Sequence, residues 1–418
     1  MSYTSPVTDA LFEETIRARR HLHAHPETGF DLDETVAFVR AHLDALDIPC
    51  TGKYGRGSLC GSVGDLSGAK PVIALRADMD ALPVQEASGV PFASQNPGRM
   101  HACGHDSHTA VLLAVAKLLK EREGTLPCGV RLVFQPSEEC AESGARMMVE
   151  NGVLDGVEAI LGVHCENALE TGKLGIHSGP YMAACVIVRA AFVGRSAHAA
   201  LPGAGIDAIA MAVKAYGEMG KAVADEAAGR PYIWSVGTFH GGTAHNVICG
   251  RCEMEISFRY YDADFAGRAL ARVREICETA AREAGGKAEV SWLVSSHAVI
   301  NDATVVSRFS DAVRSRGMPL VDIPARMSSE DFSWYLTRVP GALFRFGTRN
   351  EAAGCTALAH RPDFRIDEAG MRLAIEAFLA FALDYGRRDH SSTSPCFPQS
   401  AAEIEPAIHH DAGEGDAS

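Results

Sequence analysis

Cys103 and His105 are the first residues whose types and spacing suggest chemistry, because a thiol and an imidazole stand two positions apart with Gly104 between them. In an extended loop, residues two apart point the same way, so both side chains could hold one metal ion. The pair alone is a weak signal, since a loop cysteine that precedes the first histidine of a helix is a common arrangement.

Further acidic and imidazole groups stand directly after apolar segments that we predict to be strands. They are Asp78 and Asp80 after residues 72–75, Glu138 and Glu139 after residues 130–134, and His164 after residues 160–163. Open parallel sheets bind ligands at the carboxyl ends of their strands, so one sheet edge would gather all of these side chains. Joined to Cys103 and His105, they predict a metal site.

Glu138 and Glu139 are adjacent, and neighbouring side chains in extended backbone face opposite ways. One carboxylate can therefore bind a cation while the other takes a proton from water and delivers it to a leaving nitrogen. The alternative is a solvated pair of glutamates that opens a helix, where negative charge suits the helix dipole.

Strands that alternate with helices must position these groups. Val36, Val39, Leu43 and Leu46 recur at helical spacing, and Asp33 is available to cap that helix. Further helical patterns cover residues 109–120, 143–150, 302–314 and 367–385, and apolar strands are predicted at 71–75, 130–134, 159–163 and 342–346. This order predicts an α/β fold with a mainly parallel sheet.

A second block with its own strands and helices interrupts this pattern. Within it, Cys252, Met254, Ile256 and Phe258 alternate with polar residues, as a sheet with one wet face requires. We therefore expect a catalytic domain at 1–183 and 298–386, an inserted smaller α+β domain at 184–297, and a disordered tail at 387–418 that is poor in large apolar residues.

Composition narrows the classes of partner. The 418 residues carry a formal net charge of −14 and no cationic run, which argues against nucleic acid. We find neither a signal peptide nor an apolar stretch long enough to span a bilayer, and the 12 cysteines are scattered. We expect a cytoplasmic protein with a small-molecule ligand, no membrane partner and mostly reduced cysteines.

Taken together, these motifs resemble the M20 metallopeptidase-like amidohydrolases, in particular the branch that contains hippurate hydrolase, N-acyl-amino-acid amidohydrolases and the hydrolases of indole-acetyl amino acids. The matching segments, in family order, are Arg20–Glu27, Arg76–Pro83, His101–Asp106, Phe134–Glu139, Gly162–His164, Ala197–His198, Thr243–Val247, Ser329–Phe332 and His360. Agreement of so many spaced motifs is highly specific.

The resemblance implies two divalent metal ions, zinc, manganese, cobalt or nickel, and a set of ligands. The ligands are Cys103, His105, Glu139, His164 and His360, with the Cys103 thiolate bridging both metals. Glu138 would be the general base and acid that acts on a metal-bridged water, and Asp80 would orient the site from behind the ligands. His198, reaching over from a partner subunit or by closure, would polarise the scissile carbonyl, and Asn246 would help to hold the substrate.

The implied reaction is hydrolysis of the amide bond of N-acyl amino acids by a homodimer or higher oligomer that pairs through the inserted domain. A dipeptidase, a carbamoyl- or allantoate-type amidohydrolase and a metal-dependent binding protein without turnover remain alternatives. The sequence departs from the family pattern near His198 and after Asn246, where Gly203 and Cys249 stand. These departures leave the acyl group, the amino acid and the stereochemistry open.

Other polar residues receive simpler interpretations. We expect the cluster of His21, His23 and His25 to have a surface or capping role, and His108 to help open the helix that follows it. Glu330 and Asp331 would either cap a helix or support the site.

Overall fold

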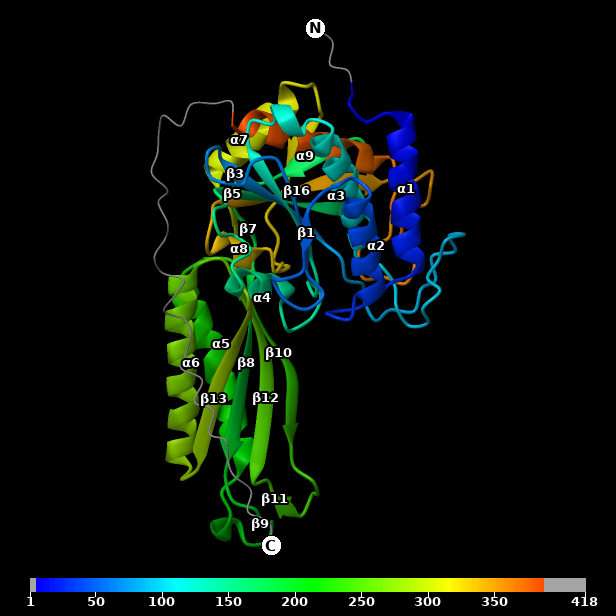
Figure 1. Cartoon of the computed structure of the whole chain (residues 1–418). Helices are drawn as coiled ribbons and strands as arrows, with labels where there is room; N and C mark the ends of the chain where they lie inside the picture. Colours follow the sequence, from blue (N-terminus) through cyan, green and yellow to red (C-terminus); the bar gives the residue numbers. More distant parts are fainter. Residues whose placement is uncertain (1–4, 387–418) are drawn as a thin grey trace, which may run out of the picture. The chain divides into compact units, whose positions relative to one another are not determined.

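A computed structural model describes residues 5–386 of the chain, so the predicted tail at 387–418 lies outside the described residues. The described residues form two compact units, one of residues 5–186 and 293–386 and the other of residues 187–292 (Figure 1). Within residues 5–386, no helix combines the length and the apolar character that crossing a bilayer requires.

The first unit is built on an eight-stranded sheet of order β1-β2-β4-β3-β5-β16-β6-β15. The strands are β1 (Cys50–Thr51), β2 (Leu59–Val63), β3 (Val72–Asp78), β4 (Gly129–Gln135), β5 (Ala159–Glu170), β6 (Leu174–Ile176), β15 (Leu320–Asp322) and β16 (Gly341–Arg349). The four central strands β4, β3, β5 and β16 all pair in parallel. The prediction of an α/β fold with a mainly parallel sheet is confirmed.

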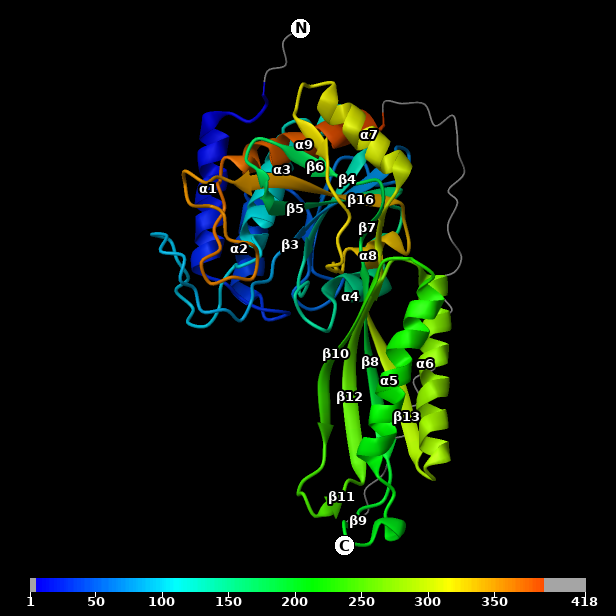
Figure 2. The same cartoon turned by 180° about the vertical axis from the view of Figure 1, so that it is seen from behind.

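Helices cover both faces of this sheet (Figures 1 and 2). One face packs on α1 (Asp9–Ala24), α2 (Asp33–Asp44), α3 (His105–Lys120), α7 (Ala303–Arg314) and α9 (Gly370–Tyr385), and the other on α4 (Gly144–Glu150) and α8 (Ser333–Leu336). Alternate strand residues divide between the two cores: Leu75 and Phe344 face the first, and Ala74 and Leu343 face the second. Central strands buried on both faces explain the continuous apolar runs in the sequence.

Two short pairs of strands and two short 3-10 helices lie outside the two larger sheets. β7 (Gly179–Met182) pairs antiparallel with β14 (Val299–Asn301), and β9 (Ala197–His198) pairs antiparallel with β11 (Val247–Ile248). The 3-10 helices are Glu123–Thr125 and Pro202–Ala204.

The second unit has a four-stranded sheet of order β10-β12-β8-β13. Its elements are β8 (Ala184–Val193), α5 (Ala208–Ala227), β10 (Tyr232–Gly241), β12 (Arg251–Tyr260), α6 (Ala263–Glu283) and β13 (Lys287–Ser296). Along β12, Met254 and Phe258 are buried while Glu253 and Glu255 are exposed, as the alternation in the sequence predicts for a sheet with one wet face.

The predicted cap of the second helix is wrong in its detail. α2 begins at Asp33, so this residue lies within the first turn, and Leu32 stands at the capping position without a side-chain hydrogen bond. The Glu27 carboxylate instead accepts hydrogen bonds from the backbone N–H groups of Glu34 (3.2 Å) and Thr35 (2.7 Å). A distant acidic residue thus satisfies the free N–H groups that a local cap usually serves.

Candidate metal centre

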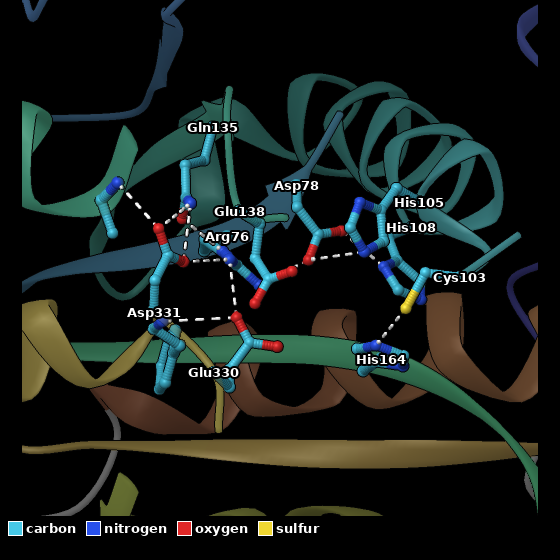
Figure 3. Close-up of polar contacts among 12 residues, drawn as sticks. Arg76, Asp78, Cys103, His105, His108, Gln135, Glu138, His164, Glu330 and Asp331 are labelled. Atoms are coloured by element: carbon cyan, nitrogen blue, oxygen red, sulfur yellow. Dashed lines mark hydrogen bonds and ion pairs between the residues drawn. The ribbon is translucent and has the colours of Figure 1, made fainter. Parts of the chain in front are cut away.

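The carboxyl ends of the central parallel strands gather predicted site residues in one place, and Figure 3 shows Cys103, His105, Glu138 and His164 of this set. β3 ends at Asp78, Glu138 and Glu139 follow the end of β4, and β5 carries His164. The amino end of α3 brings His105 to the same edge. The first unit therefore contains the whole predicted ligand set.

Groups of these residues place their ligand atoms within 4.8 Å of one another. One group is Cys103, His105 and His164, and another is Cys103, Glu139 and His360. The Cys103 Sγ lies 3.4 Å from the His164 Nε2, and the His360 Nε2 lies 3.2 Å from a Glu139 oxygen. Cys103 belongs to both groups, so its Sγ lies within 4.8 Å of ligand atoms of the other four residues.

Backbone carbonyls fix which ring nitrogen of each histidine faces the centre. The His105 Nδ1 donates a hydrogen bond to the Asp80 carbonyl at 2.7 Å, and the His164 Nδ1 donates to the Cys165 carbonyl at 2.6 Å. Because a carbonyl can only accept, both rings carry their proton on Nδ1 and keep Nε2 free. The buried His105 Nε2 has no hydrogen-bond partner among residues 5–386.

Three residues in left-handed backbone shape the loops that carry the ligands. Gly104 (φ +88°) turns the chain between Cys103 and His105, and Ser137 (φ +52°) turns it before the two glutamates. His360 itself has φ +70°, and its backbone N–H donates to the Ala102 carbonyl at 2.8 Å. Non-glycine residues in this region store strain and are frequent at functional sites.

Asp80 holds the two glutamates through their backbone. One of its carboxylate oxygens accepts from the Glu138 N–H at 2.9 Å and the other from the Glu139 N–H at 3.1 Å. Its side chain is buried and lies 3.6 Å from the His105 Nδ1. Asp80 thus lies behind the ligands and contacts three of the predicted site residues.

The electrostatics favour a cation at this centre. Although burial opposes it, the carboxylates around His105, with Asp78 foremost, raise its pKa to about 10. Burial and the nearby Arg345 lower the pKa of His164 and keep that ring neutral. Divalent metal ions, zinc in particular, fit this set of groups, which consists of one imidazole in a negative environment, a neutral imidazole, a thiol and a carboxylate.

Glu138 has the electrostatic surroundings of a strong proton acceptor. Loss of hydration, followed by the negative charges of Glu330 and Glu139, raises its pKa well above the usual range. Its carboxylate lies within 4.8 Å of ligand atoms of His105 and Glu139. The geometry thus brings both glutamates to the centre.

A buried guanidinium to which the motif analysis gave no role acts close to the glutamates. Arg76 donates to Asp78 at 2.8 Å, to Glu330 at 2.9 Å, to Asp331 at 3.2 Å and to Gln135 at 2.8 Å. Glu330 and Asp331 are buried here, where they contact Arg76. The sequence signals were the two matching segments Arg76–Pro83 and Ser329–Phe332, which do not reveal that Arg76 pairs with Glu330 and Asp331.

His108 lies in the first turn of α3 but is buried. Its Nδ1 is 2.6 Å from an Asp78 oxygen, and its Nε2 accepts the Cys165 backbone N–H at 2.8 Å. Both ring nitrogens are thus engaged, and the ring connects the end of β3 to β5 beside His164.

His198 and Asn246 belong to the second unit, so the two units divide the predicted site residues. The pairing of β9 with β11 places them close together, because the Ala199 N–H donates to the Asn246 carbonyl at 2.9 Å. Both side chains are exposed. The His198 Nδ1 accepts the Ala200 N–H at 3.0 Å, which leaves the ring proton on Nε2.

A cluster of thiol, imidazole and carboxylate groups that could hold metal ions, at the carboxyl edge of a parallel sheet, is typical of metal-dependent hydrolases. Residues 74–384 match Peptidase family M20/M25/M40, and the chain belongs to this family.

Individual relatives agree with that membership. The chain is 35% identical over 375 residues to an N-acetyl-L-cysteine deacetylase of Bacillus subtilis (88% of this chain, 87% of the relative). It is 34% identical to an IAA-amino acid hydrolase of Arabidopsis thaliana (90% and 81%). A solved dinuclear metal-binding M20 peptidase of Bacillus subtilis superposes with a TM-score of 0.80 at 32% identity, covering 91% of this chain and 99% of that one.

Gly104→Ala tests the packing of the ligand loop. A Cβ at this position would lie 2.4 Å from the buried Cys165 Sγ, so either this thiol or the loop that carries Cys103 and His105 must shift. We expect metal affinity, measured by competition with a chelator, to fall about tenfold or more, as for other changes behind metal ligands. Gly98→Ala is the matched control, because its φ is also positive (+76°) but its Cβ would meet nothing within 4 Å. Equal affinity in both variants would contradict this explanation.

Proposed function

We propose that this chain hydrolyses the amide bond of N-acyl amino acids with two divalent metal ions, held by Cys103, His105, Glu139, His164 and His360. The observation that carries the proposal is the convergence of these five side chains with an adjacent second glutamate, Glu138. The M20 relatives named for N-acetylcysteine and for an IAA-amino acid support this substrate class. A panel of substrates would identify the preferred acyl group and amino acid.

Glu138 supplies the proton transfer. When bound, two divalent cations supply Lewis-acid activation of water and stabilisation of negative charge on the carbonyl oxygen. Glu138 accepts a proton from the attacking water and donates it to the amide nitrogen, which is a poor leaving group until it is protonated. Burial and the neighbouring carboxylates raise the pKa of Glu138, which favours holding the accepted proton until it passes to the leaving nitrogen. Asp80 keeps Glu138 in place through the backbone contact.

We propose that the inserted domain, residues 184–297, acts as a lid and a dimerisation domain. Its His198 would donate from the protonated Nε2 to the scissile carbonyl, and the neighbouring Asn246 would hold the substrate. Closure or pairing of subunits would bring both residues to the metal centre.

The thiolate ligand and the free cysteines bear on the native metal and on the location of the protein. A thiolate ligand favours zinc, and manganese, cobalt and nickel remain candidates because supply decides occupancy. The eleven cysteines within residues 5–386 are all free, which supports a cytoplasmic enzyme. Metal analysis of protein purified without added metal would identify the ion.

Glu138→Gln tests the proton transfer. The amide has nearly the same shape and cannot accept a proton, so we expect kcat to fall on the order of 10³-fold while two metals remain bound. Acetyl-, benzoyl-, indole-acetyl- and carbamoyl-amino acids and a dipeptide would be assayed with the parent, and metal content measured for both proteins. Unchanged turnover would remove Glu138 from the mechanism, and a preference for the dipeptide or the carbamoyl compound would replace the substrate class.

His198→Ala tests the contribution of the inserted domain. Removing a donor to a developing oxyanion should lower kcat/KM on the order of 10²-fold and leave metal content unchanged. The control is His240→Ala, because His240 is another exposed histidine of the same unit. If both variants cleave amides like the parent, His198 has no part in catalysis.

Pairing through the second unit is testable by sedimentation. Its sheet ends in the edge strands β10 and β13, and α5 exposes Val213 (55%) and Tyr216 (53%). Unpaired strand edges and exposed apolar side chains favour association with a second copy. We expect a dimer at micromolar concentration, and a monomer alone under these conditions would exclude the proposed pairing.

A further inference from the structure

Arg345 is a buried cation next to the proposed metal ligand His164. β16 pairs in parallel with β5, and the register sets Arg345 opposite His164 (Figure 2 shows the two strands). Paired residues of parallel strands carry their side chains on the same face, about 4.8 Å apart along the hydrogen-bonding direction. Arg345 therefore lies beside a proposed metal ligand within the first unit, and its charge acts on the His164 ring.

The charge of Arg345 has no ion-pair partner among residues 5–386. The residue is 3% exposed, its Nε donates to the Tyr181 hydroxyl at 2.9 Å, and its Nη2 lies 3.2 Å from the Met182 sulfur. Its Nη1 makes no hydrogen bond to any described residue. Arg76, by contrast, contacts three carboxylates. Buried charges are normally paired, so Arg345 has unused capacity for an anion.

The nearby carboxylates are already engaged by other groups. Glu166 lies two residues beyond His164 on β5, and its oxygens contact the Arg326 guanidinium at 2.7 Å and the Ala168 N–H at 2.9 Å. Glu330, which also acts on Arg345 electrostatically, is bound by Arg76. Glu166 and Glu330 therefore act on Arg345 through their charge, while their oxygens make direct contacts with other donors.

Arg326 extends the positive charge from the buried residue towards solvent. Its guanidinium and that of Arg345 both lie 5.7 Å from the centre of the Tyr181 ring. The Arg326 side chain is 31% exposed. Two guanidiniums thus lie beside Tyr181: that of Arg326 reaches the surface, and that of Arg345 is buried next to His164 on the sheet.

We propose that Arg345 binds the free carboxylate of the substrate's amino-acid part and so determines that the enzyme acts on N-acyl amino acids and not on neutral amides. This inference rests on the proposed function. A guanidinium and a carboxylate match in shape, and the charge-assisted bond is strong in a site that excludes water. Binding at this point would place the substrate beside His164.

Arg345→Met and Arg345→Lys test the inference with a pair of substrates. The parent and both variants, loaded with metal, would be assayed with an N-acetyl amino acid and with its α-amide, which lacks the negative charge, and acetate release measured. We expect Arg345→Met to raise KM for the acid about 30-fold, to change the α-amide less than threefold, and to keep two metals. Arg345→Lys keeps the charge without the planar geometry, so its KM for the acid should lie between that of the parent and that of Arg345→Met.

Arg349→Met is the matched control, because Arg349 lies on the same strand and pairs with Glu351 at 2.8 Å. It should retain the parent's preference for the acid. An unchanged ratio of acid to α-amide in Arg345→Met would overturn the assignment, and if that variant fails to fold, an unchanged ratio in Arg345→Lys would do the same. A parent that cleaves neither compound would refute the proposed function instead. Calorimetric binding of the N-acetyl amino acid to the parent and Arg345→Lys would then still decide the role of Arg345, since equal affinities would exclude it.

Discussion

The contacts of Arg76 are what allow the acidic residues to lie together at the sheet edge. Asp78, Glu330 and Asp331 meet in a region with little water, where like charges repel strongly. The guanidinium lies among them and donates to all three. It fixes the end of β3 against the segment that follows β15, two regions that are distant in sequence. Asp78 in turn contacts His108, which reaches β5 beside His164, so the position of a ligand depends on this one cation.

Much of the centre could be predicted because its chemistry is local in sequence. Cys103 and His105 share one loop, Glu138 and Glu139 are adjacent, and apolar strands immediately precede the acidic residues. Ligands bind at the carboxyl ends of parallel strands, so these residues could be assigned to one site without knowledge of how the strands pair. The helices and strands followed from periodicity, as with β12 and its alternating residues.

Contacts between distant strands could not be predicted in the same way. Arg345 lies in an apolar strand, and its relation to His164 depends on the pairing of β16 with β5, which no local pattern specifies. His23 shows the same problem: we expected a surface or capping role, yet it is buried between Asp106 at 2.8 Å and Glu86 at 3.1 Å. Two carboxylates from distant segments compensate for its burial, and a single sequence does not reveal such partners.

The five proposed ligands differ greatly in their access to water. The side chain of His360 is 55% exposed, whereas that of Glu139 is 10% exposed and that of His105 is fully buried. A ligand bond at the surface can open when its loop moves, while a buried one must first displace packed neighbours. Two cations held by the proposed ligands would therefore differ in kinetic lability, and a cation held by His360 would exchange with the medium first. An enzyme of this design could keep one ion permanently and take the other according to the metal supply of its surroundings.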